Sequence, residues 1–136
     1  MAVGLPAAQA DASVGAMTAT LQINPTSLPG QQFVKVEGVV RMTSTEAQRM
    51  IDSRYNLVIR LWGEDGFSDD LLMGPYNPAY VHADISGLRF STGNYVSNSV
   101  LNEDWGVDEI YAGVRLIQPN SVTLRSAETN GVYGSF

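Results

Sequence analysis

The chain has 136 residues, a hydrophobic share of 44%, a charged share of 16% and a formal net charge of −6. This length suits one domain that buries roughly two thirds of its surface, and the absence of cysteine excludes disulfides, thiolate metal sites and cysteine nucleophiles. We expect no nucleic-acid partner, because the chain is acidic and has no Lys/Arg cluster. No apolar run approaches the ~20 residues that a membrane-spanning helix needs.

The first sixteen residues are small and show no hydrophobic periodicity. Ala8-Gln9-Ala10 has the small-residue pattern of a secretory cleavage site, but a basic start and a full apolar core are missing. We predict a flexible leader over residues 1–16, either a signal-peptide remnant or an Ala-rich extension, and a single domain over residues 17–136. The first alternative favours a secreted or extracytoplasmic protein, and the second leaves a cytoplasmic one open.

Alternating hydrophobic residues predict strands over residues 17–24 and 32–42. Gly38 interrupts the second strand and predicts a bulge there. Residues 43–53 predict the only helix, because Thr43 can cap it and Glu46 occupies the capping-box position. This short helix is expected to lie over one end of a sheet.

Residues 55–62 predict the central strand, since bulky side chains occupy both of its faces. Leu57, Ile59 and Leu61 form one face, and the other holds Val58, Arg60 and Trp62. Residues 63–70 predict a loop. Pro75 and Pro78 make strand pairing of the following apolar patch, residues 71–73, difficult.

Residues 79–85 alternate and predict a strand with Ile85 facing inward and His82 facing outward. Residues 88–91 continue the sheet across a hairpin, and residues 92–101 predict a loop and then a short strand from about Tyr95. Further strands are predicted over residues 110–116, 122–125 and 131–136, the last at an edge. Seven or eight short strands with regular turns indicate a two-sheet antiparallel β-sandwich with immunoglobulin-like or jelly-roll connections. A small β-barrel is the alternative.

The carboxylates are unevenly placed, because two segments of eight residues hold eight of the fourteen. They are Glu64, Asp65, Asp69 and Asp70 in the first segment, and Glu103, Asp104, Asp108 and Glu109 in the second. If the strands beside these segments are antiparallel neighbours, both segments lie at the same end of the sandwich. Ca²⁺ would then relieve the repulsion between carboxylates. Neither segment has an EF-hand pattern, so solvated surface loops are the alternative.

Trp62 and Trp105 flank these segments and could stack on a sugar or another ligand, although core packing would also account for them. His82 is the only histidine, and no nucleophile motif accompanies it, so we predict no enzyme. The leading prediction is a non-catalytic, extracytoplasmic module that binds a protein or carbohydrate ligand, with Ca²⁺ as a possible cofactor. The alternative is a structural or assembly protein that forms oligomers through edge strands, in particular the apolar strand that ends at Phe136.

Overall fold

The computed structural model describes residues 14–64, 69–102 and 108–136. One sheet has the order β1-β2-β6-β5, with strands Met17–Pro25 (β1), Gln31–Arg41 (β2), Gly87–Ser97 (β6) and Tyr80–Asp84 (β5). The other has the order β4-β3-β7-β8, with strands Asp69–Tyr76 (β4), Asn56–Glu64 (β3), Asp108–Ile117 (β7) and Thr123–Glu128 (β8). A further strand, β9 (Val132–Gly134), pairs with β7, and the two helices are α2 (Ser44–Asp52) and α3 (Asn98–Leu101).

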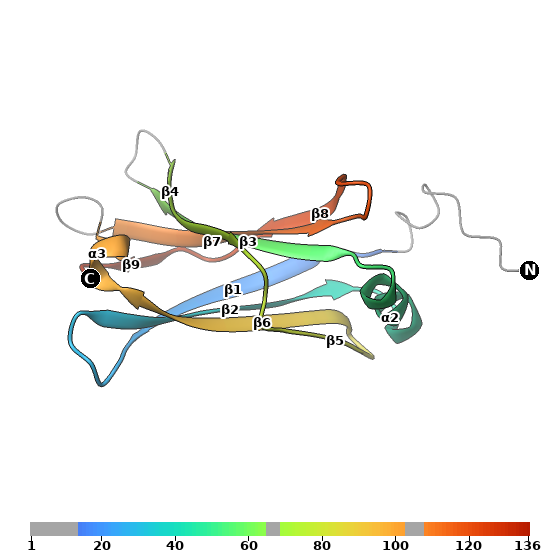
Figure 1. The fold of residues 1–136 in the computed structure, drawn as a ribbon, viewed down its shortest axis with the longest axis horizontal. Helices are drawn as coiled ribbons and strands as arrows, with labels where there is room; N and C mark the ends of the chain where they lie inside the picture. The colour runs from blue at the N-terminus through green and yellow to red at the C-terminus, as the bar shows by residue number, and fades with distance from the viewer. Residues whose placement is uncertain (1–13, 65–68, 103–107) are drawn as a thin grey trace, which may run out of the picture.

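The two sheets pack face to face as an antiparallel β-sandwich, which confirms the predicted fold class (Figure 1). Their strand orders correspond to the A-B-E-D and C′-C-F-G sheets of the immunoglobulin architecture, so the connections are immunoglobulin-like and not those of a jelly roll. Neither sheet closes on itself in the described part of the chain, and the barrel alternative is wrong. Within those residues, no helix has the length and apolar character that crossing a bilayer requires.

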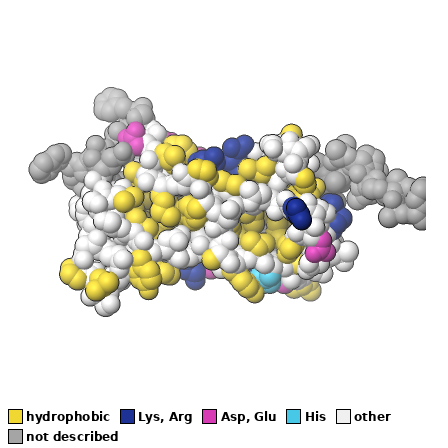
Figure 2. Space-filling view, viewed as in Figure 1, with side chains coloured by type: hydrophobic (Ala, Val, Ile, Leu, Met, Phe, Trp, Pro, Cys, Tyr) yellow, Lys and Arg dark blue, Asp and Glu magenta, His cyan; other side chains and the backbone are white. Residues whose placement is uncertain are grey.

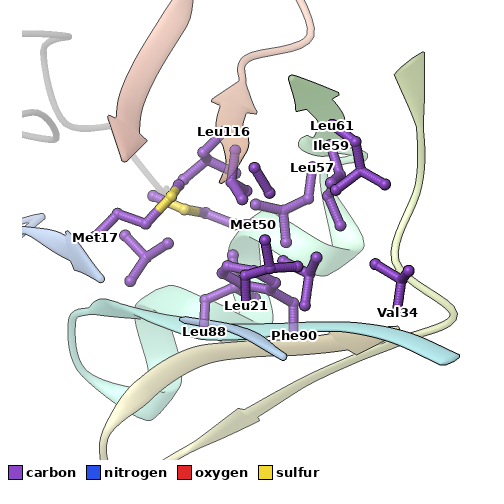
Figure 3. Close-up of a cluster of buried hydrophobic side chains, with 14 of the residues drawn as sticks. Met17, Leu21, Val34, Met50, Leu57, Ile59, Leu61, Leu88, Phe90 and Leu116 are labelled. Atoms are coloured by element: carbon purple, nitrogen blue, oxygen red, sulfur yellow. The ribbon is translucent and has the colours of Figure 1, made fainter. Parts of the chain in front are cut away.

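The core lies between the sheets and is built from the inward faces of their strands (Figure 3). Leu57, Ile59 and Leu61 of β3 are at most 4% exposed, as the predicted central strand requires. Phe90 of β6 meets them from the other sheet at 2% exposure. Met50 of α2 is fully buried, so this helix covers one end of the sandwich, as predicted.

Gly38 does not form a bulge, because the pairing of β2 with β1 runs through it without a shift in register. A Cβ atom at this position would lie 2.2 Å from the Thr18 carbonyl oxygen and 2.6 Å from the Phe90 ring. The absence of a side chain at Gly38 therefore leaves the space that β1 and the Phe90 ring occupy. At the start of α2, the Thr43 hydroxyl accepts a hydrogen bond from the Glu46 N–H (3.1 Å), while the Glu46 carboxylate pairs with Arg49. Only half of the predicted capping box is therefore formed.

Several predicted loops are strand in the structure. β3 extends to Glu64 and β4 begins at Asp69, so residues 63, 64, 69 and 70 of the predicted loop belong to strands, and residues 65–68 lie outside the described residues. β4 pairs with β3 despite Pro75, and shifts in register between Ile59 and Trp62 accommodate the pairing. β6 continues to Ser97 through residues predicted as a loop. Ile85 is 95% exposed in a tight turn, so its predicted inward position is wrong.

Side chains from β8 and from the segment after it form hydrogen bonds to the backbone at the outer edge of β1 and just before it. The Asn130 amide accepts a hydrogen bond from the Leu21 N–H (2.9 Å) and donates one to the Leu21 carbonyl oxygen (3.1 Å). The Arg125 guanidinium donates to the Gly15 carbonyl oxygen (3.1 Å), and Val14 is 3% exposed. Ordered packing thus begins before the predicted boundary at residue 17.

Candidate functional site

The described carboxylates of the two predicted acidic segments lie side by side at one end of the β4-β3-β7-β8 sheet. Glu64, the last residue of β3, pairs in register with Asp69 of β4 on one side and with Glu109 of β7 on the other. The end of β3 and the starts of β4 and β7 thus share one end of the sandwich (Figure 1). The three carboxylates come from three adjacent strands, and we refer to Glu64, Asp69 and Glu109 as the acidic row.

The acidic row is electrostatically strained. Like charges placed directly opposite each other on neighbouring strands destabilise a sheet. The hydrogen bond between the Glu64 and Glu109 carboxyl groups, together with the negative charge of Glu109, raises the pKa of Glu64 above its ordinary value. Glu64 therefore holds its proton more tightly than an isolated carboxyl group does.

Two tyrosines bond to the acidic row and orient it. The Tyr111 hydroxyl donates a hydrogen bond to Asp69 Oδ2 (2.5 Å). Desolvation and this bond raise the pKa of Tyr111. Tyr133 of β9 donates a hydrogen bond to Glu109, which raises the pKa of the Tyr133 hydroxyl. Neither tyrosine was predicted as a site residue, although their outward positions beside the carboxylates follow from strand alternation.

The remaining predicted ligands do not join the acidic row in the described structure. Asp70 pairs with Gly63, and strand alternation places it on the opposite face of β4 from Asp69. Among the residues that the structure describes, no group of three or more His, Cys, Asp or Glu side chains has the arrangement of a metal site. Asp65, Glu103, Asp104 and Trp105 lie outside the described residues, as does the side chain of Asp108.

Trp62 lies on the outward face of the same sheet, two residues before Glu64. It lines a groove of about 480 Å³ across β3, β7 and β8, with Arg60, Gly113, Val114, Arg115, Ser126, Ala127 and Glu128. A Cβ atom at Gly113 would lie 3.4 Å from the Trp62 indole nitrogen, so the indole lies over this glycine on the neighbouring strand. The tryptophan is half-buried and belongs to a surface groove, not to the core between the sheets.

Two arginines line the groove beside Trp62 and were not predicted as site residues. Arg60 pairs in register with Gly113, and Arg115 lies two residues farther along β7. The Arg115 Nε donates a hydrogen bond to the Thr123 hydroxyl (3.0 Å). Alternation along each strand indicates that Arg60 and Arg115 face outward, but only the pairing of the strands brings them together with Trp62.

His82 takes part in an ion-pair cluster on the outward face of the other sheet. Its Nε2 lies 3.4 Å from Asp84 Oδ2, and the Arg89 Nε lies 2.6 Å from the same oxygen. Desolvation works against ionisation of Asp84, but the Ser86 N–H and the Arg89 charge outweigh it and lower the pKa of Asp84. No serine or threonine hydroxyl among the described residues hydrogen-bonds to His82, so the cluster does not form a catalytic triad.

No protein-family model, curated protein or solved structure matches this chain. The residues of the β4-β3-β7-β8 sheet, with the acidic row at one end and the Trp62 groove beside it, are therefore the basis for a functional hypothesis.

Proposed function

We propose that the protein is a non-catalytic, extracytoplasmic binding module whose ligand surface is the outward face of the β4-β3-β7-β8 sheet and whose acidic end binds Ca²⁺. The observation that carries the proposal is the meeting of Glu64 and Glu109 in one register pair, with Asp69 beside them. A folded protein gains no stability from three carboxylates placed in a row unless something positive joins them.

Calcium suits the chemistry of this end of the sheet. It accepts six to eight oxygen ligands in flexible geometry, including carboxylates and backbone carbonyl groups. Glu64 and Glu109 would supply two carboxylates, and backbone carbonyl groups and water would complete the shell. Calcium sites of extracellular modules bind at about 10⁻⁴–10⁻³ M, which agrees with a site of few protein ligands outside the cytoplasm.

A thermal melt in millimolar CaCl₂ and in EDTA tests the proposal. We expect Ca²⁺ to raise the melting temperature because a ligand that binds only the folded state stabilises it by mass action. Glu64→Gln and Glu109→Gln should each abolish this shift, whereas Glu37→Gln, in the other sheet and paired with Lys35 at 3.4 Å, should retain it. Equal melting temperatures of the unmodified protein in CaCl₂ and EDTA would exclude calcium.

Assembly through subunit contacts is a second proposal, favoured by one surface of the other sheet. The rings of Phe33 and Tyr95 are in contact there, with centroids 5.2 Å apart and planes tilted by 58°, and Leu28 beside them is 61% exposed. The C-terminal strand supports assembly less than the sequence suggests, because β9 pairs with β7 and Phe136 packs against the core. Light scattering over a wide range of protein concentration tests this proposal, and a constant monomer mass would refute it.

A further inference from the structure

We infer that the Trp62 groove binds a uronic-acid unit of an acidic polysaccharide, with the sugar ring on the Trp62 indole and its carboxylate between Arg60 and Arg115. This inference rests on the proposed binding face and names its ligand. It does not depend on calcium, because the groove and the acidic row use different side chains.

The spacing of the three side chains suits one sugar unit. Arg60 and Trp62 are two residues apart on β3 and so project from the same face, roughly 7 Å apart. Arg115 pairs in register with Val58, which makes it a diagonal neighbour of Arg60, with backbones roughly 7–8 Å apart. An aromatic side chain provides a flat apolar surface for the C–H face of a sugar, and polar side chains around it fix the orientation.

The charges of the groove select an anion. No carboxylate of a described residue forms an ion pair with Arg60 or Arg115, whereas Lys35, Arg49 and Arg89 each have an acidic partner. Figure 2 shows basic side chains gathered over the middle of this sheet, in a protein whose net charge is −6. Guanidinium groups bind carboxylates with paired, charge-assisted hydrogen bonds.

The charges of the groove are also separated across the strands, which fixes the direction of the ligand. Glu128 of β8 faces Arg60 of β3 across Gly113, because both residues pair in register with this glycine. A carboxylate beside Glu128 would meet repulsion, while sugar hydroxyl groups could donate hydrogen bonds to Glu128. The anionic group of the ligand therefore lies on the β3 side of the groove, beside Arg60, and neutral hydroxyl groups lie on the β8 side, beside Glu128.

A saccharide fits this surface better than an acidic peptide does. Trp62, Arg60 and Arg115 lie on β3 and β7, the two inner strands of the sheet, which pair with strands on both sides. An extended peptide gains much of its affinity from main-chain hydrogen bonds to a free sheet edge, and the inner strands that carry Trp62 and the two arginines offer no such edge. The side chains of the groove do offer an aromatic surface and a hydroxyl group, that of Ser126, which suit a sugar ring.

The test is a titration of nitrogen-15-labelled protein with oligogalacturonate in EDTA, followed by NMR and calorimetry. We expect the indole N–H signal of Trp62, identified by its absence in Trp62→Phe, to shift on binding. Arg60→Gln and Arg115→Gln should each weaken binding about tenfold, the loss expected for one charge-assisted interaction. Arg41→Gln removes the same charge from an exposed position in the other sheet and should leave the affinity within about twofold.

Three further outcomes decide the inference. Methyl-esterified oligogalacturonate keeps the sugar rings and loses the charge, so binding as tight as that of the acid would refute the role of the arginines. Poly-glutamate binding as tightly as oligogalacturonate would show a general attraction of anions and overturn the saccharide assignment. No binding of oligogalacturonate would overturn it as well. Because EDTA is present throughout, none of these results depends on whether the acidic row binds calcium.

Discussion

Asn130 is expected to stabilise the protein far more than an exposed polar residue usually does. β1 is an edge strand of its sheet, and Leu21 directs its N–H and carbonyl group away from β2. The Asn130 side chain takes the place of a neighbouring strand by bonding to both groups, across 109 positions in the sequence. It therefore ties the two sheets together at the side where β1 meets the connection between β8 and β9.

Asn130→Ala should destabilise the protein by about 1–3 kcal/mol. Each lost hydrogen bond has a net value of about 0.5–1.5 kcal/mol, and a buried backbone group left without a partner raises the cost. Leu21 is 2% exposed, so water cannot easily replace both bonds. For a chain of this length, the corresponding fall in melting temperature is roughly 3–10 °C.

Urea denaturation measures the free energy of unfolding, and hydrogen exchange reports the Leu21 amide directly. In Asn130→Ala, the protection of the Leu21 amide against exchange should fall about ten- to a hundredfold, since each 1.4 kcal/mol of free energy corresponds to about a tenfold change in the equilibrium constant. Asn120→Ala is the matched control, because Asn120 accepts a hydrogen bond only from the nearby Val122 N–H (3.1 Å) in an exposed turn. It should change stability by no more than about 0.5 kcal/mol. Equal effects of the two variants, with unchanged Leu21 protection, would refute the role assigned to Asn130.

Two further predictions concern the acidic row and the interior of the other sheet. Because the pKa of Glu64 is raised in the folded state, that state loses stability as the pH rises from the ordinary carboxyl pKa through the raised one. In EDTA, Glu64→Gln should therefore be more stable than the unmodified protein at neutral pH and equally stable at acid pH. Denaturation curves at several pH values measure the free energy of unfolding of both proteins. A difference in this free energy that does not change with pH would refute the prediction. Gly38→Ala should destabilise by at least about 1–3 kcal/mol, because its Cβ would lie 2.2 Å from the Thr18 carbonyl oxygen. Gly113→Ala is the control, since its nearest contact is at 3.4 Å, and equal melting temperatures for the two variants would contradict the steric reason.

The strands that could be predicted from the sequence are those with one buried apolar face and one more exposed polar face. β7 alternates between buried residues such as Ile110 and Val114 and more exposed ones such as Arg115, so its period of two is readable in the sequence. β4 could not be recognised in this way, because its apolar residues are adjacent and Pro75 cannot donate a hydrogen bond. Its pairing depends on β3, which shifts its register between Ile59 and Trp62 to accommodate it.

The arrangement of the acidic row and the Trp62 groove could not be predicted for a related reason, which is that it depends on the register between strands. Burial of Leu57, Ile59 and Leu61 requires Arg60, Trp62 and Glu64 to face outward, and the sequence of β3 alone indicates this. A slip of β7 by two residues would keep every core residue inward. It would, however, place Arg60 opposite Arg115 and Glu64 opposite Tyr111, and it would separate Glu64 from Glu109. The observed register instead puts Glu64 opposite Glu109 and Arg60 opposite Gly113, which leaves room for the Trp62 indole. The acidic row and the groove therefore have a common origin in the alignment of β3 with β7.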